Sequence, residues 1–218
     1  MSRENLLRRA LVYCFGLFVT ALGVTMSVNA NLGVSPVSST PYVLSLIFPF
    51  TQGTFTSAMF IVFVLGQMLL LRRDYKWFNL AQLPASVLFG LFVDLTNFLF
   101  GNFRIPTYFG QLTMMVFSIV LIATGIVLFM APQIVLLPSE GFTAAVAQKL
   151  NVPFHRVKVF SDSILSSIAI LLSLIFLGGL FGVREGTVIT AIFVGRVIPY
   201  ARKAVYPILD KIIDTPTF

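Results

Sequence analysis

Long apolar runs separated by short polar stretches dominate the chain. Each run is close to or above the roughly 18–20 residues that a helix needs to cross a bilayer. The runs occupy residues 10–30, 53–71, 79–100, 109–131, 157–180 and 186–201. Only helices and closed barrels satisfy their backbone hydrogen bonds in lipid, and the sequence lacks the alternating ten-residue strands typical of a barrel. The pattern therefore predicts an all-α, polytopic membrane protein with six transmembrane helices in one membrane domain.

Two shorter apolar segments differ from these runs because each places a proline among hydroxyl side chains. LGVSPVSSTPY covers residues 32–42, and LLPSEGFT covers residues 136–143. The uncharged stretch 36–50 and its counterpart 138–150 are too short to cross a bilayer. Proline is favoured at the first position of a helix, and the neighbouring serines can cap it. We expect two re-entrant half-helices, with an interfacial helix or an ordinary loop as the alternative for each.

The second half of the chain repeats the first at an offset of 102 residues. ALGVTMSVNANLGVSPVSS, which begins at Ala21, lies over ATGIVLFMAPQIVLLPSEG, which begins at Ala123, so that Pro36 falls on Pro138. Further along, SVLFGLFVD lies over TVITAIFVG at an offset of 101. The sustained register, with proline on proline, indicates a true internal repeat.

Each repeat contains three predicted spans, at residues 8–100 and 109–201. An odd number of spans makes the second repeat enter the membrane from the opposite side. The sequence thus predicts two inverted repeats, related by a pseudo-two-fold axis in the membrane plane. Residues 202–218 form a tail whose apolar positions recur on one helical face, which predicts an interfacial helix.

Charge supports the topology. Of the residues, 57% are hydrophobic and 11% are charged, against about 25% charged in soluble domains. Thirteen of the 15 Lys and Arg residues lie at the same side of the predicted spans, so the positive-inside rule predicts that both termini are in the cytoplasm. The net charge of +7 is therefore a sign of topology and not of nucleic-acid binding. The thirteen are Arg3, Arg8, Arg9, Arg72, Arg73, Lys76, Lys149, Arg156, Lys158, Arg196, Arg202, Lys203 and Lys211.

The half-helix N-termini are the predicted binding site. A helix N-terminus presents unpaired backbone N–H groups and the positive end of the helix dipole, which together attract anions. Two such ends that converge near the membrane midplane would bind a carboxylate or another anion. The alternative is that the side chains only cap helices and bond to local carbonyls. The candidate substrate-binding residues are Ser35, Ser38, Ser39, Thr40, Ser139, Glu140, Gly141 and Thr143.

Ionisable residues inside predicted spans are candidates for coupling or charge compensation, because burying a charge in a membrane is costly. Asp94 lies late in the third span, and Arg196 in the sixth lies one residue from the equivalent position, so we consider a pair between them. Arg196 could instead snorkel to the cytoplasmic surface. Asp162 lies one turn into the fifth span, where an interfacial cap partnered by Lys158 is the alternative.

No catalytic or metal signature accompanies these residues. His155 is the only histidine and Cys14 the only cysteine, so the sequence indicates no metal site. Motifs for hydrolysis, phosphate binding and dinucleotide binding are absent from the sequence. We expect neither enzymatic activity nor a cofactor.

The punctuated segments resemble those of the YczE/YyaS/YitT group of bacterial membrane proteins. LGVSPVSSTPYVLSLIFP followed by GTFT, and PSEGFTAAVAQKL followed by GVREGTVITAIFVG, carry the resemblance, which extends from about Arg8 to Tyr200. Asp94 and Asp162 match acidic positions of that group. The branch that is most similar is an uncharacterised domain of unknown function. The resemblance implies a polytopic cytoplasmic-membrane protein with a suspected transport role, and it implies no substrate.

Taken together, the sequence predicts a small secondary transporter or exporter of an anionic or zwitterionic solute. A passive channel is one alternative. A non-transporting accessory or regulatory subunit, including a substrate-binding subunit of a larger transporter, is another. The expected partners are the lipid bilayer and a small-molecule solute, and the sequence leaves a homo-oligomer open.

Overall fold

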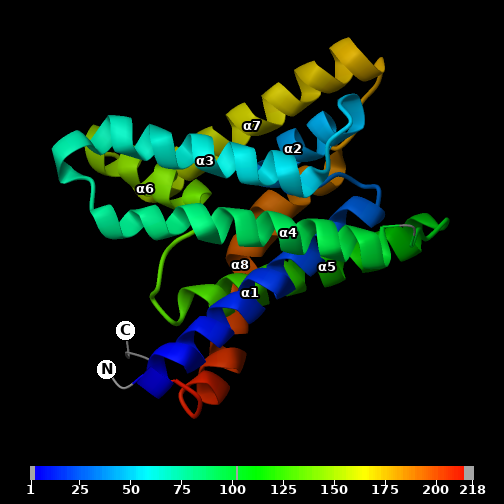
Figure 1. Ribbon diagram of the computed structural model, residues 1–218. Coiled ribbons are helices and arrows are strands. Elements are labelled where there is room, and N and C mark those ends of the chain that lie inside the picture. The colour runs from blue at the N-terminus through cyan, green and yellow to red at the C-terminus, as the bar shows by residue number, and fades with distance from the viewer. Residues whose placement is uncertain (1–2, 102, 214–218) are drawn as a thin grey trace.

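The computed structural model describes residues 3–101 and 103–213, and these residues form helices and no strand (Figure 1). Two short 3₁₀ turns, η1 and η2, connect the third and fourth helices at Arg72–Asp74 and Trp77–Ala81. The eight α-helices are α1 (Arg3–Asn29), α2 (Pro36–Ile47), α3 (Gln52–Leu71), α4 (Gln82–Phe100), α5 (Tyr108–Met130), α6 (Pro138–Leu150), α7 (Phe154–Leu177) and α8 (Glu185–Leu209).

Five of these helices are long and apolar enough to cross a membrane: α1, α3, α4 with the turn before it, α5 and α7. The prediction of a helical, multi-pass membrane protein is therefore confirmed. The predicted sixth span, 186–201, does form a helix within α8, but α8 is not among the five. Its Arg196, Arg202 and Lys203 lower its mean hydropathy. The count of six spans accordingly remains a prediction.

The two proline-punctuated segments form the short helices α2 and α6, of 12 and 13 residues. At about 1.5 Å per residue they are roughly 18–20 Å long, too short for a hydrocarbon core of about 30 Å. Proline begins each helix, as expected. The expected serine caps are absent from both helices: the cap position of α2 is Ser35, which makes no cap bond, and that of α6 is Leu137.

The helices α1 and α5 pack closely and antiparallel at the centre of the molecule. A Cβ added to Gly23 of α1 would lie 2.8 Å from the backbone nitrogen of Ile122, and one added to Gly125 of α5 would lie 2.6 Å from that of Thr20. Thr20 and Ile122 are 102 residues apart, as are Gly23 and Gly125. The two contacts are thus equivalent, as in an interface with two-fold symmetry. Small residues allow this approach of two membrane helices.

The remaining helices follow the same symmetry in most of their packing. α1 packs on α4 as α5 packs on α8, α2 packs on α7 as α6 packs on α3, and α2 packs on α3 as α6 packs on α7. Even the backbone after the first helix of each half repeats, since Asn31 and Gln133 both have a positive φ, of 55° and 53°. One contact breaks the symmetry: α3 packs along α4, whereas α7 and α8 do not form a comparable contact.

The predicted tail, residues 202–218, is only partly described. Its first part belongs to α8, which continues without interruption to Leu209. Leu209 and Ile213 are buried in a cluster with Leu128 and Ala131 at the end of α5. The tail therefore packs against the helical core as far as it is described, and residues 214–218 lie outside the described residues.

Because α1 and α5 approach each other so closely, adding one methyl group at their contact should destabilise the protein strongly. We expect Gly125→Ala to lower the free energy of unfolding by about 2 kcal/mol, because the new Cβ meets the backbone of Thr20, which cannot move alone. Gly195→Ala on α8 is the matched control, since a Cβ there has nothing within 4 Å, and it should be neutral or slightly stabilising. Thermal unfolding of both variants in detergent measures the difference. Equal stability of Gly125→Ala and wild type would contradict the close approach.

Candidate functional site

A cavity of about 100 Å³ lies where both half-helices meet α7, and we refer to it as the central cavity. The half-helix α2 contributes one wall residue and the half-helix α6 contributes three. Most of the walls are apolar, with a lysine and an aspartate on the α7 side. Its lining residues are Val37, Phe63, Ser139, Phe142, Thr143, Lys158, Ser161, Asp162, Ile164 and Leu165.

The central cavity is lined by residues from both halves of the chain. Val37 and Ser139, in the first turns of the two half-helices, both line it, and their positions are 102 residues apart. Phe63 of α3 and Leu165 of α7 form a second equivalent pair on its walls. Both halves of the chain therefore contribute residues at the same offset of 102 to the walls of this cavity.

The contacts that hold the half-helices beside the cavity are also equivalent in position, although they differ in chemistry. Thr40 of α2 donates a hydrogen bond of 2.9 Å to the carbonyl of Leu165. At the corresponding place in the other half, the ring of Phe142 on α6 stacks on Phe63, with ring centres 5.3 Å apart. Each half-helix is therefore held by the long helix of the opposite repeat.

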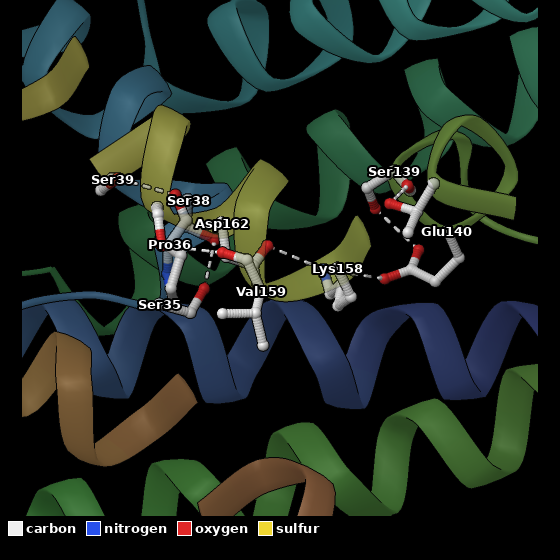
Figure 2. Close-up of polar contacts among 11 residues, drawn as sticks. Ser35, Pro36, Ser38, Ser39, Ser139, Glu140, Lys158, Val159 and Asp162 are labelled. Carbon is white, nitrogen blue, oxygen red and sulfur yellow. Dashed lines mark hydrogen bonds and ion pairs between the residues drawn. The ribbon is translucent and has the colours of Figure 1, made fainter. Parts of the chain in front are cut away.

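Three charged side chains from the second repeat meet beside the cavity. Lys158 Nζ lies 3.0 Å from Asp162 Oδ1 and 3.9 Å from Glu140 Oε1 (Figure 2). Glu140 also accepts a hydrogen bond of 2.7 Å from the hydroxyl of Ser139. We call Glu140, Lys158 and Asp162 the charged cluster. The equivalent positions in the first repeat are uncharged: Ser38, Thr56 and Phe60.

The predicted residues of α6 are found at or beside this site. Ser139 and Thr143 line the central cavity, and Glu140 joins the charged cluster. Gly141 faces the other side of α6, where an added Cβ would lie 2.8 Å from Oε1 of Gln67. The alternative for Asp162, a partnership with Lys158, is what the structure contains, although this pair borders a cavity.

The predicted binding residues of α2 do not line the central cavity, and their hydroxyl groups form hydrogen bonds within the protein. Ser35 donates to Ser38 over 3.0 Å, and Ser39 donates to the carbonyl of Pro36 over 2.7 Å. Thr40 bonds to Leu165 as described above. Figure 2 shows these serines gathered at the start of α2. Local bonding of this kind was the stated alternative to a binding role.

Asp94 and Arg196 do not meet. Asp94 accepts hydrogen bonds from the Thr51 hydroxyl, at 2.7 Å, and from the Gly53 backbone N–H, at 2.8 Å. It thereby caps the N-terminus of α3 from the neighbouring α4. The side chain of Arg196 is exposed, with its guanidinium 5.7 Å from the ring centre of Phe193. Neither residue lines the central cavity.

A pair of buried carboxamides, Gln67 and Gln82, is not predicted from the sequence pattern. Gln67 donates to Gln82 over 2.9 Å, and Gln82 donates back over 3.2 Å. Gln67 also donates to the carbonyl of Pro138, which is the first residue of α6, over 3.3 Å. Both side chains are almost fully buried. Two glutamines within otherwise apolar spans were the signal that could have revealed this anchor for α6.

A second cavity, of about 140 Å³, lies on the far side of α6 from the central cavity. Its walls carry four carboxamides and no charged group. Within the described residues, no group of three or more His, Cys, Asp and Glu could hold a metal ion. The lining residues of this second cavity are Gln67, Leu71, Asn79, Gln82, Leu136, Gly141, Ala144, Ala145 and Gln148.

Because Asp94 caps α3 and does not line the central cavity, its substitution should destabilise the protein and leave the cavity intact. We expect Asp94→Ala to lower the free energy of unfolding by about 1–2 kcal/mol, because Thr51 and the N–H of Gly53 lose a charged acceptor. Asp94→Asn keeps one acceptor oxygen, so its free energy of unfolding should fall by about half as much as that of Asp94→Ala. Chemical denaturation in mixed micelles measures both variants. A stability of Asp94→Ala equal to wild type would show that the cap contributes nothing.

Because Gln67 and Gln82 bond to each other, substitutions at these two positions should have non-additive effects on stability. We expect Gln82→Leu to destabilise the protein by about 1 kcal/mol, since it leaves the carboxamide of Gln67 with one partner fewer in an apolar surrounding. The double variant Gln67→Leu/Gln82→Leu should be less destabilised than the sum of the two single variants. Additive losses in a double-mutant cycle would mean that the two side chains act independently.

Comparison with known proteins gives one match. Residues 7–203 match the model of DUF6198, a family of unknown function. No curated protein and no solved structure matches the chain.

Proposed function

The chain belongs to the DUF6198 family of unknown function, and we propose that it is a secondary transporter whose solute binds in the central cavity. One observation carries the proposal: equivalent residues of the two repeats, Val37 with Ser139 and Phe63 with Leu165, line the same cavity. In transporters built from inverted repeats, the solute binds at the interface of the repeats, between interrupted helices. The short helices α2 and α6 play the part of those interrupted helices here.

The proposal includes the inverted 3+3 design. In it α1, α3 and α4 form one set of spans, and α5, α7 and α8 form the other. The antiparallel packing of α1 and α5 supports it, because equivalent helices of inverted repeats cross the membrane in opposite directions. In this design α8 is the sixth span, and α2 and α6 are re-entrant from opposite faces.

We also propose the orientation and the wider relationship that the sequence indicates. The distribution of Lys and Arg supports an orientation with both termini in the cytoplasm, and the membrane in this proposal is a bacterial inner membrane. The resemblance to the YczE/YyaS/YitT group belongs to the proposal as well. It is compatible with a transporter, and the DUF6198 match does not depend on it.

Of the two expected solute classes, the charged cluster favours a zwitterion over a simple anion. Glu140 and Asp162 give the cluster two negative charges against the single positive charge of Lys158. A bare anion would face this excess charge, which costs about 4 kcal/mol for two unit charges 4 Å apart at an effective dielectric constant of 20. A zwitterion can direct its carboxylate to the N-termini of α2 and α6, and its cationic end to the carboxylates. Glu140 and Asp162 are also the proposed sites for a coupling proton.

Transport of small zwitterions by the purified protein in proteoliposomes tests the proposal. We expect saturable uptake of a labelled zwitterion from a panel that includes glycine, alanine and glycine betaine, together with thermal stabilisation by the same solute. Ser139→Leu fills the cavity and should reduce uptake at least tenfold. Ser167→Leu, on the exposed outer face of α7, should leave uptake unchanged.

Three outcomes would contradict the proposal. If no solute of the panel is taken up or stabilises the protein, the proposed transport function is contradicted. Uptake that rises linearly with concentration would assign a channel instead. Equal uptake by Ser139→Leu and wild type would place the solute elsewhere in the protein.

A further inference from the structure

The lysine of the charged cluster lies between carboxylates of two different helices. Asp162 is one turn further along α7, and Glu140 is on the first turn of α6. The distances from Lys158 Nζ, 3.0 Å and 3.9 Å, show a close contact with one carboxylate and a loose contact with the other. Both carboxylates contact the same ammonium group, that of Lys158. One ammonium group thus serves two negative charges.

The contact between Asp162 and Lys158 is short, but it is not aligned as a hydrogen bond. Oδ1 of Asp162 is buried and lies 3.0 Å from Lys158 Nζ, without hydrogen-bond geometry to it. A buried carboxylate oxygen is normally satisfied by a well-aligned donor. An ammonium group that is free to reorient can therefore pair with Asp162 in better geometry than the tethered ammonium of Lys158.

The walls of the central cavity suit a small apolar body attached to such a donor. Phe63 and Phe142 stack on each other at its edge, and Val37, Ile164 and Leu165 complete the apolar lining. The side chain of Lys158 combines the same two features, a slender hydrocarbon chain and a terminal ammonium group. The protein thus already holds an alkylammonium ion between these carboxylates, attached to its own backbone.

We propose that the central cavity is a site for a primary ammonium group, and that Lys158 is an internal substitute for the solute. When a solute binds, its ammonium group takes the place of Lys158 between Glu140 and Asp162. The released Lys158 is then available to pair with a carboxylate of the same solute. This inference rests on the proposed transport function and specifies its solute as a primary amine or an amino acid.

Charge and hydrogen bonding separate this class from the other candidates. With an amino acid bound, each carboxylate and each ammonium group has a partner of opposite sign. A simple anion would add a third negative charge to the cluster. A quaternary ammonium carries no N–H, so it cannot donate a hydrogen bond to the buried Oδ1 of Asp162. The site should therefore reject glycine betaine and accept primary amines.

Chemical rescue tests the proposal without a transport assay. Lys158→Ala removes the atoms of n-propylammonium and leaves two carboxylates without their cation. We expect the variant to melt several degrees below wild type, and n-propylammonium chloride to restore at least half of the loss in a saturable manner. Tetramethylammonium chloride and NaCl at the same ionic strength should restore little, with at least tenfold weaker apparent affinity. Thermal unfolding and isothermal titration calorimetry in nanodiscs provide the readouts.

Matched variants complete the experiment. Lys149→Ala, at an exposed lysine near the end of α6, should show neither the loss nor the rescue. Lys158→Ala/Asp162→Asn should lose the rescue, since a recipient carboxylate is gone. Lys158→Met keeps a hydrocarbon chain and vacates the position of the ammonium group between the carboxylates. It should fold even if the alanine variant does not, and methylammonium should stabilise it by placing its ammonium group at that position.

The outcomes are distinct from those of the transport test. Equal restoration by n-propylammonium, tetramethylammonium and NaCl would overturn the ammonium site, as would no effect of primary amines on either Lys158 variant. Rescue without any solute uptake would support the ammonium site and contradict the transport function. Uptake of zwitterions without rescue would support transport and overturn the assignment of Lys158.

Discussion

The close antiparallel packing of α1 on α5 determines the arrangement of the other helices. In a membrane the hydrophobic effect does not drive helices together, so association depends on close packing and on polar contacts. The glycines at positions 23 and 125 allow each helix to reach the backbone of the other. Because the two contacts are equivalent, the two halves of the molecule are placed around one axis. The half-helices, and with them the central cavity, follow from that placement.

The half-helices depend on polar and aromatic contacts more than the long helices do. α2 and α6 have no side-chain caps and are too short to be stabilised by spanning the lipid. α6 is held at its first residue by Gln67, and α2 is held at its centre by the bond from Thr40 to Leu165. Both anchors come from helices of the opposite repeat. A rearrangement of one half of the chain against the other would therefore have to break or shift these two contacts.

The sequence allowed much of the architecture to be predicted, because its strongest signals are local. Apolar length identified the long helices, and proline at positions 36 and 138 marked the first residues of α2 and α6. The repeat register could be read from the alignment alone, and the equivalent contacts of Gly23 and Gly125 agree with it. In contrast, the membrane role of α8 remains open, since its apolar stretch is interrupted by Arg196 and proline.

The site itself was harder to predict, because it depends on which side of a helix faces which neighbour. The serines of α2 and α6 have similar sequence surroundings, yet Ser139 lines the cavity while Ser39 bonds to its own helix. Asp94 was a candidate for coupling, and only the position of Thr51 beside it reveals a cap. Lys158 was noted as a surface partner of Asp162, since nothing local indicates that Glu140 approaches it from another helix.

The confinement of the charged cluster to one repeat has a consequence for how such a molecule can arise. If the two halves were separate, identical chains assembled as a homodimer, the axis would duplicate every charge. Two lysines and four carboxylates would then surround one small cavity. Fusion of the halves into a single polypeptide removes this constraint, because each copy can diverge alone. The neutral Ser38, Thr56 and Phe60 opposite Glu140, Lys158 and Asp162 are a difference that two identical chains could not maintain.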